Sequence, residues 1–174
     1  MTRTTSENPF VHPSSTPLRK RTIARAQKEP ASADEGWLNV EELAEVEITS
    51  EDPAHPIESA LLPDRLSGWR AATPGQQTIR LFFDQPQRLR RIWINFVEPG
   101  TERTQEYTLR WSPDCGRSFR NIVRQQWNFS SRGATNETED HQVELPAVTV
   151  LELSIIPDIS GGNALASLAQ LRLA

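Results

Sequence analysis

Hydrophobic side chains recur at every second position along most of the chain beyond residue 35. Within Leu89–Glu98, for example, Ile92, Ile94 and Phe96 alternate with polar or amphipathic neighbours. Successive side chains of a β-strand point to opposite faces, so this spacing predicts strands with one buried face. We expect about eight strands, in Glu45–Thr49, Gln77–Asp84, Leu89–Glu98, Thr104–Ser112, Phe119–Phe129, His141–Leu145, Val148–Ile156 and Leu168–Leu173.

The segments between these strands are short and contain turn residues, such as Asp84–Gln87. One short helical turn is expected near Pro56–Leu62. Parallel pairing needs long crossovers, so most strands should pair antiparallel. Val148–Ile156 is apolar and rich in β-branched residues, which favours a buried central strand. The sequence therefore predicts an all-β jelly-roll sandwich.

The first 35 residues differ in composition from the rest. They are rich in Ser, Thr and Pro, carry more basic than acidic residues and show no hydrophobic period. We interpret residues 1–35 as a disordered basic tail and residues 36–174 as the folded domain. The basic run Leu18–Arg21 could contact an acidic partner, but a solvated stretch is the favoured interpretation.

Composition excludes several classes of protein. A net charge of −4 argues against nucleic acid as the main partner. No apolar stretch is long enough for a membrane span, and no apolar run follows the basic N-terminal residues as in a signal peptide. The single cysteine, Cys115, excludes an intrachain disulfide. We expect a cytoplasmic protein.

The segment Trp111–Phe119 ends a strand in Ser, makes an Asp-Gly type turn and opens the next strand with an aromatic residue. It resembles the discoidin family, also called the coagulation factor 5/8 type C domain, within the galactose-binding-like jelly rolls. Further similar segments, in the family's order, are Ile48–Ser50, Gly68–Ala71 with a structural Trp, the paired strands Gln77–Phe83 and Arg91–Phe96, and the closing Ala169–Leu173. The resemblance covers Val46 to Ala174 and implies carbohydrate binding.

Two positions depart from the family pattern. Cys115 stands where the family turn usually has Gly. Many carbohydrate-binding members hold a structural calcium near the loop that would contain Asp64, completed by a Glu near the final strand. Gln170 occupies that second position here, and calcium affinity depends on carboxylate count. Asp64 is therefore only a weak calcium candidate, and no cofactor is expected.

No catalytic constellation is visible. His12 falls in the tail, His55 in a loop and His141 on a strand, where a structural role is the favoured alternative. No metal-ligand spacing of His or Cys and no Gly-rich phosphate loop occurs. We expect a protein that is not an enzyme.

Two constellations could bind a ligand. Sugar recognition needs a flat aromatic and side chains that satisfy hydroxyl groups. The loop before Tyr107 and two later strands offer such groups, and sugar-binding relatives often carry an Arg in this loop. The candidates are Arg103, Gln105, Arg124, Gln126, Trp127 and His141. The structural alternatives are a rim salt bridge for Arg103 and core packing for Trp127, as expected for Trp69 and Trp111.

The second constellation is an outer sheet face on two neighbouring strands. It would present Arg80, Phe82, Arg91, Trp93 and Asn95. Two large aromatic side chains beside arginines would form an exposed apolar patch unless another surface packs against them. A protein partner, a second copy or the chain's own Trp37–Leu43 could provide that surface. Cover by the chain itself is the favoured alternative.

These observations predict a non-catalytic binding module. A glycan or glycosylated partner is the first hypothesis, by family analogy. The alternative is an intracellular protein–protein interaction adaptor that uses an exposed sheet face or the loop end.

Overall fold

The computed structural model describes residues 36–65, 67–100 and 102–174. The predicted disordered tail, residues 1–35, lies outside the described residues. The strands are β1 (Ala44–Ile48), β2 (Trp69–Pro74), β3 (Gln77–Val97), β4 (Arg103–Ser112), β5 (Arg120–Phe129), β6 (Asn136–Ile156), β7 (Leu165–Leu168) and β8 (Gln170–Leu173). The helices α1 (Val40–Leu43) and α2 (Glu58–Leu61) are single turns. Neither described helix is long enough to cross a membrane.

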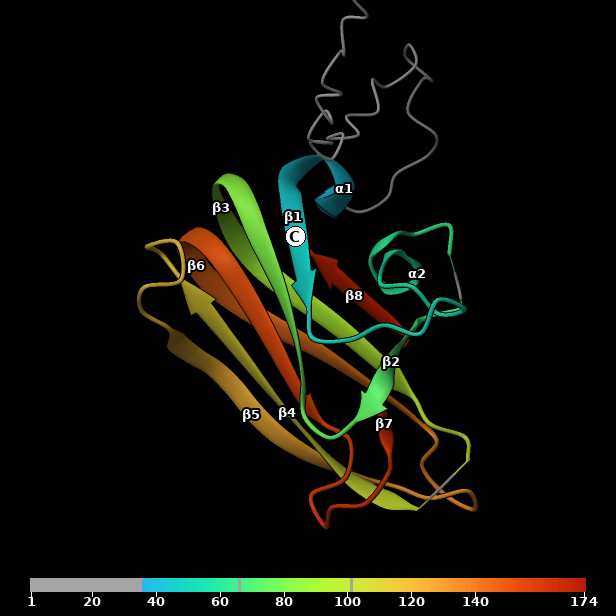
Figure 1. Cartoon of the computed structure of the whole chain (residues 1–174). Coiled ribbons are helices and arrows are strands. Elements are labelled where there is room, and N and C mark those ends of the chain that lie inside the picture. The colour runs from blue at the N-terminus through green and yellow to red at the C-terminus, as the bar shows by residue number, and fades with distance from the viewer. Residues whose placement is uncertain (1–35, 66, 101) are drawn as a thin grey trace, which may run out of the picture. The chain divides into compact units, whose positions relative to one another are not determined.

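The two longest strands, β3 and β6, pair antiparallel along their whole length and form the spine of the domain (Figure 1). Their register shifts between Phe82 and Arg91, where four residues of β3 bulge opposite the single residue Thr149. A bulge bends a strand and increases its twist. Each strand therefore contributes one half to each layer of the sandwich.

This continuity corrects one expectation. Gln77–Asp84 and Leu89–Glu98 are not two strands joined by a turn, and they do not pair with each other. Both belong to β3 and pair with β6, whose halves are the expected His141–Leu145 and Val148–Ile156. The turn-forming residues Asp84–Gln87 occupy the bulge instead.

The strand order of the larger layer is β1-β3-β6-β4-β5, with every neighbour antiparallel. The opposite layer consists of β8, the second half of β3 and the first half of β6. A separate ribbon joins β2 to β7. The expected closing strand Leu168–Leu173 is thus two strands with different partners, separated by Ala169. The prediction of an antiparallel, galactose-binding-like sandwich of about eight strands is confirmed.

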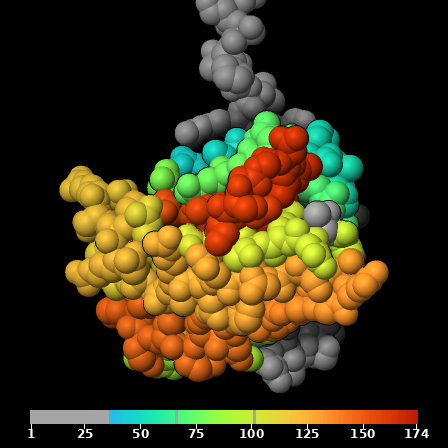
Figure 2. Space-filling view, turned by 90° about the horizontal axis from the view of Figure 1, so that it is seen from below, coloured from blue at the N-terminus to red at the C-terminus, as the bar shows by residue number. Residues whose placement is uncertain are grey.

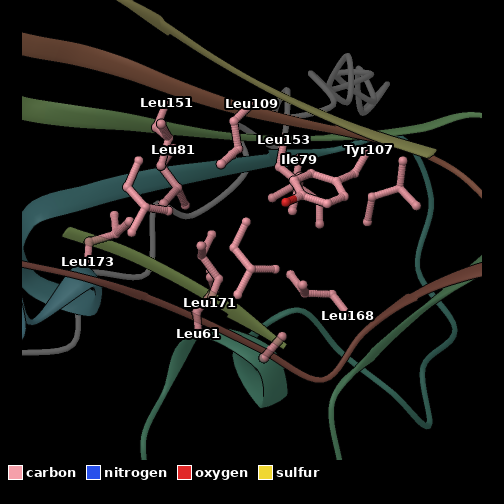
Figure 3. Close-up of a cluster of buried hydrophobic side chains, with 14 of the residues drawn as sticks. Leu61, Ile79, Leu81, Tyr107, Leu109, Leu151, Leu153, Leu168, Leu171 and Leu173 are labelled. Carbon is pink, nitrogen blue, oxygen red and sulfur yellow. The ribbon is translucent and has the colours of Figure 1, made fainter. Parts of the chain in front are cut away.

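The core fills the space between the layers with hydrophobic side chains, mostly aliphatic in the cluster shown in Figure 3, where Tyr107 adds an aromatic ring. Leu81, Leu109 and Leu151 come from the larger layer, whereas Leu171 and Leu173 come from β8. All five are at most 1% exposed. Trp69 is also 1% exposed and Trp111 is 6% exposed, so both are core residues as expected.

Candidate functional site

A polar groove follows the outer face of the larger layer. It has a volume of about 560 Å³ and crosses β3, β6, β4 and β5. Its lining residues are Gln76, Thr78, Arg80, Glu106, Thr108, Arg110, Asn121, Arg124, Glu152, Ser154 and Ile156. Strand register explains the gathering, because every second residue of each paired strand points to this face. Arg80, Glu152 and Arg110, for instance, lie side by side on β3, β6 and β4.

Glu152 is the centre of the groove. Its side chain is only 2% exposed because two guanidinium groups cover it. Arg80 donates from Nε to Oε2 at 2.8 Å, and Arg110 donates from Nε to Oε1 at 2.8 Å. Both guanidinium groups also lie over the Phe119 ring, with Cζ at 6.0 Å and 4.9 Å from its centroid. The two arginines are therefore held in fixed positions while each keeps about 40% of its side chain exposed.

A second carboxylate, Glu106, anchors the other end. Arg124 donates to it from Nε at 2.9 Å and from Nη2 at 3.1 Å, and Gln126 donates from Nε2 at 2.8 Å. These hydrogen bonds hold the pKa of Glu106 below its usual value, against the opposing effect of burial. Glu106 is therefore ionised at neutral pH, and Arg124, 71% exposed, is oriented by it.

A second hollow of about 550 Å³ lies at the end of the sandwich, between residues 98–100 and the segment that leads into β7. In the view of this end, the red segment before and within β7 lies between green β2 and yellow-green residues at the end of β3 (Figure 2). Arg103 lines this hollow but is only 7% exposed, because it pairs with Glu98 and donates to the Leu165 carbonyl at 3.2 Å. Its guanidinium is thus buried and held by Glu98 and the Leu165 carbonyl, although its Nε has no hydrogen-bond partner among the described residues.

The other residues of this loop-end hollow are a mixture of polar and small or apolar side chains, and no aromatic ring lines it among the described residues. Arg70 is exposed at its edge, and Asn163 and two glycines line the loop. Asp158 has a lowered pKa because Ser160 donates hydrogen bonds to it, with a smaller contribution from the Arg103 charge.

The six predicted ligand residues do not come together. Arg124 and Gln126 line or flank the groove, whereas Arg103 lies at the loop end. Gln105 is fully buried, and Trp127, opposite it on β5, packs against the core. The reason is the strand period: positions 124 and 126 face outward and positions 105 and 127 face inward.

His141, the sixth, lies between the layers and bonds to a core tyrosine. The distance from its Nε2 to the Tyr107 hydroxyl oxygen is 3.0 Å. Burial, with a smaller contribution from the Glu139 charge, raises the pKa of Tyr107 well above its usual value. Tyr107 therefore stays protonated and can donate to His141.

The predicted outer face of Arg80, Phe82, Arg91, Trp93 and Asn95 is also divided. Because β3 bends between the layers, the first two residues lie on the larger layer and the last three on the opposite one. The centroid of the Trp37 ring lies 4.7 Å from Arg91 Cζ and 5.7 Å from Arg172 Cζ. The chain's own segment thus covers part of the second half, which was the favoured alternative.

The calcium candidate Asp64 is exposed beside α2, in a hollow that also contains Arg65 and Arg172. Gln170 lies on β8 opposite Asn95. Among residues 36–65, 67–100 and 102–174, no three His, Cys, Asp or Glu side chains gather as metal ligands would.

Neither the known family models nor the curated protein sequences contain a match to this chain. Solved structures do match it. The domain CBM32-5 of CpGH89 from Clostridium perfringens, in complex with GalNAc-β-1,3-galactose, has a TM-score of 0.60 at 18% identity, covering 79% of this chain and 99% of that one. The CBM32 of AlyQ, in complex with 4,5-unsaturated mannuronic acid, has a TM-score of 0.57 at 15% identity over 76% and 95%.

A protein-binding structure matches equally well. Reduced XRCC1 bound to the DNA polymerase β catalytic domain has a TM-score of 0.57 at 12% identity, covering 76% of this chain and 95% of that one. These similarities establish the discoidin-like, galactose-binding-like fold of the chain. Its resemblance in sequence to the discoidin family agrees with that fold.

Proposed function

We propose that the protein is a non-catalytic carbohydrate-binding module and that the outer-face groove is its binding site. The observation that carries the proposal is the set of three arginines oriented by two buried carboxylates. Guanidinium groups have five N–H donors each, so donors remain after Glu152 and Glu106 are satisfied. Thr78, Thr108 and Ser154 add hydroxyl groups between them.

Such a surface suits a sugar because a sugar presents many hydroxyl groups in fixed directions. Preorganised donors bind hydroxyl groups without a further loss of side-chain freedom. Ile156 supplies the limited apolar contact in the groove lining. The groove volume of about 560 Å³ is within the range of small-molecule sites. The similarity to glycan-bound modules supports this class of ligand by analogy.

A calorimetric titration against a panel of neutral and acidic oligosaccharides tests the function. Asn121→Ala and Asn163→Ala form a matched pair, since each removes one exposed amide, the first in the groove and the second in the loop-end hollow. We expect sugar binding in the wild type, weakened several-fold by Asn121→Ala and unchanged by Asn163→Ala. Absence of binding to every sugar at millimolar concentration would contradict the proposal.

A protein-interaction adaptor is the second candidate. Val97 is 42% exposed on the outer face of the smaller layer, and Trp93 lies four residues before it on the same face. An apolar and aromatic pair on an open sheet is typical of a protein interface. Trp93→Ala should then abolish capture of a protein partner while sugar binding is unaffected.

A further inference from the structure

The groove carries more positive than negative charge, although the whole chain has a net charge of −4. Its lining contains three arginines and two glutamates. Glu47, the next carboxylate along the sheet, lies on β1 beyond the groove lining. Its Oε2 is 3.9 Å from Arg80 Nη1 and its side chain is 64% exposed, so water and salt weaken its effect.

The excess of positive charge is concentrated around Glu152. One buried carboxylate there is shared by two guanidinium groups, since Oε2 accepts from Arg80 and Oε1 accepts from Arg110. The exposed Glu47 adds only a longer, screened contact to Arg80. At the other end Arg124 and Glu106 balance each other as a bidentate pair. The unsatisfied positive charge therefore lies between Arg80 and Arg110, where two exposed and fixed guanidinium groups flank a covered carboxylate.

We infer that the groove selects an acidic sugar, whose carboxylate is seated against Arg80 and Arg110. A planar carboxylate accepts two parallel N–H bonds from the edge of a guanidinium group. Such a ligand would complete a neutral arrangement of two arginines and two carboxylates. The inference rests on the proposed binding of glycans at this groove, and it names the class of glycan.

The experiment compares two probes with the same sugar rings and hydroxyl groups, trigalacturonic acid and its uncharged trimethyl ester, in which each carboxylate carries a methyl group. We expect the acid to bind wild-type protein about tenfold more tightly at low ionic strength. The difference should shrink toward equality at about 0.5 M salt. The ester should still bind, because it keeps the hydroxyl groups.

Two variants locate the preference. Arg110→Gln removes one of the two guanidinium groups, and Thr108→Glu places a negative charge in the groove while keeping the Arg80–Glu152–Arg110 cluster. Both should bring the affinities for acid and ester to within about twofold. The second variant is independent of any folding defect that a less well covered Glu152 causes in the first.

Arg88→Gln is the control, because it changes the net charge by the same amount outside the groove. Arg88 is exposed and donates to Glu144 at 3.0 Å. It should keep the tenfold preference. Equal binding of acid and ester by the wild type, or a preference that survives in Thr108→Glu, would overturn the acidic-sugar inference while sugar binding stands. Failure of both probes and of the neutral panel would overturn the proposed function itself.

Discussion

The backbone of Gly68 lies directly against the backbone of Leu168, where β2 meets β7. A methyl group built on Gly68 would stand 2.9 Å from the Leu168 carbonyl oxygen. Gly68 also has φ +66°, a conformation that disfavours residues with a side chain. Gly68→Ala should therefore lower the free energy of unfolding by more than about 2 kcal/mol, as measured by urea denaturation.

Gly75→Ala is the matched control for this prediction. Gly75 has φ +88° but no atom within 4 Å of a built methyl group. Gly75→Ala should therefore lower the free energy of unfolding by about 1 kcal/mol, the cost of the backbone strain alone. Equal losses in the two variants would show that the contact with Leu168 is not a constraint.

The turn at Cys115 presents the reverse case, because a residue with a side chain occupies a backbone conformation that favours glycine. Cys115 is the only non-glycine residue with positive φ among the described residues, at 58°. Cys115→Gly should raise the free energy of unfolding by about 0.5 to 1 kcal/mol, because relief of strain outweighs the entropy that glycine loses on folding. Cys115→Ala, which keeps the strain, should change it little. A loss of stability in the glycine variant would contradict the argument.

The alternation of side chains predicted which faces of the strands are buried, but not how far each strand continues. Asp84–Gln87 has the composition of a turn, and that composition suits a bulge equally well. Nothing local distinguishes a hairpin from a strand that bends into the second layer. The choice is made by pairing with β6, a partner distant in the sequence.

The groove likewise depends on contacts between residues distant in the sequence, which local patterns do not reveal. Sequence reasoning placed Arg124 and Gln126 among the ligand residues but treated Val148–Ile156 as a wholly buried strand, and so missed Glu152. Its burial was anticipated, since it is 1% exposed. Its cover is not the core, however, but Arg80 and Arg110, which are 72 and 42 residues away in the chain. A charged residue inside an apolar, β-branched run was the signal that could have revealed it.

Acid should weaken the fold through Asp114. Hydrogen bonds from Ser112 and Ser118 hold the pKa of Asp114 at about 2, below its usual 3.8. A pKa lowered by folding stabilises the folded state above pH 3.8, and that contribution is lost as the pH falls toward about 2. Thermal melts of the wild type and Asp114→Asn should therefore differ at pH 5 and converge at pH 2. A constant difference in Tm would refute the assignment.

Gln105 provides a prediction that separates ligand binding from packing. Its side-chain amide is buried on the inner face of β4, and neither the oxygen nor the nitrogen has a hydrogen-bond partner among the described residues. An unsatisfied buried polar group costs about 1 to 3 kcal/mol. Gln105→Met has similar volume and no such group, so it should raise Tm by several degrees and leave sugar binding unchanged.

Gln125→Met is the comparison on the neighbouring strand β5. Gln125 donates to Glu139 at 3.2 Å and lies 3.5 Å from the Tyr107 hydroxyl group. Its replacement breaks these contacts and should lower Tm. If Gln105→Met also lowers Tm, the Gln105 amide has a partner in solution, such as a buried water, and its burial is not a cost. If Gln105→Met instead abolishes sugar binding without loss of stability, the ligand enters between the layers and not the groove, because Gln105 faces inward.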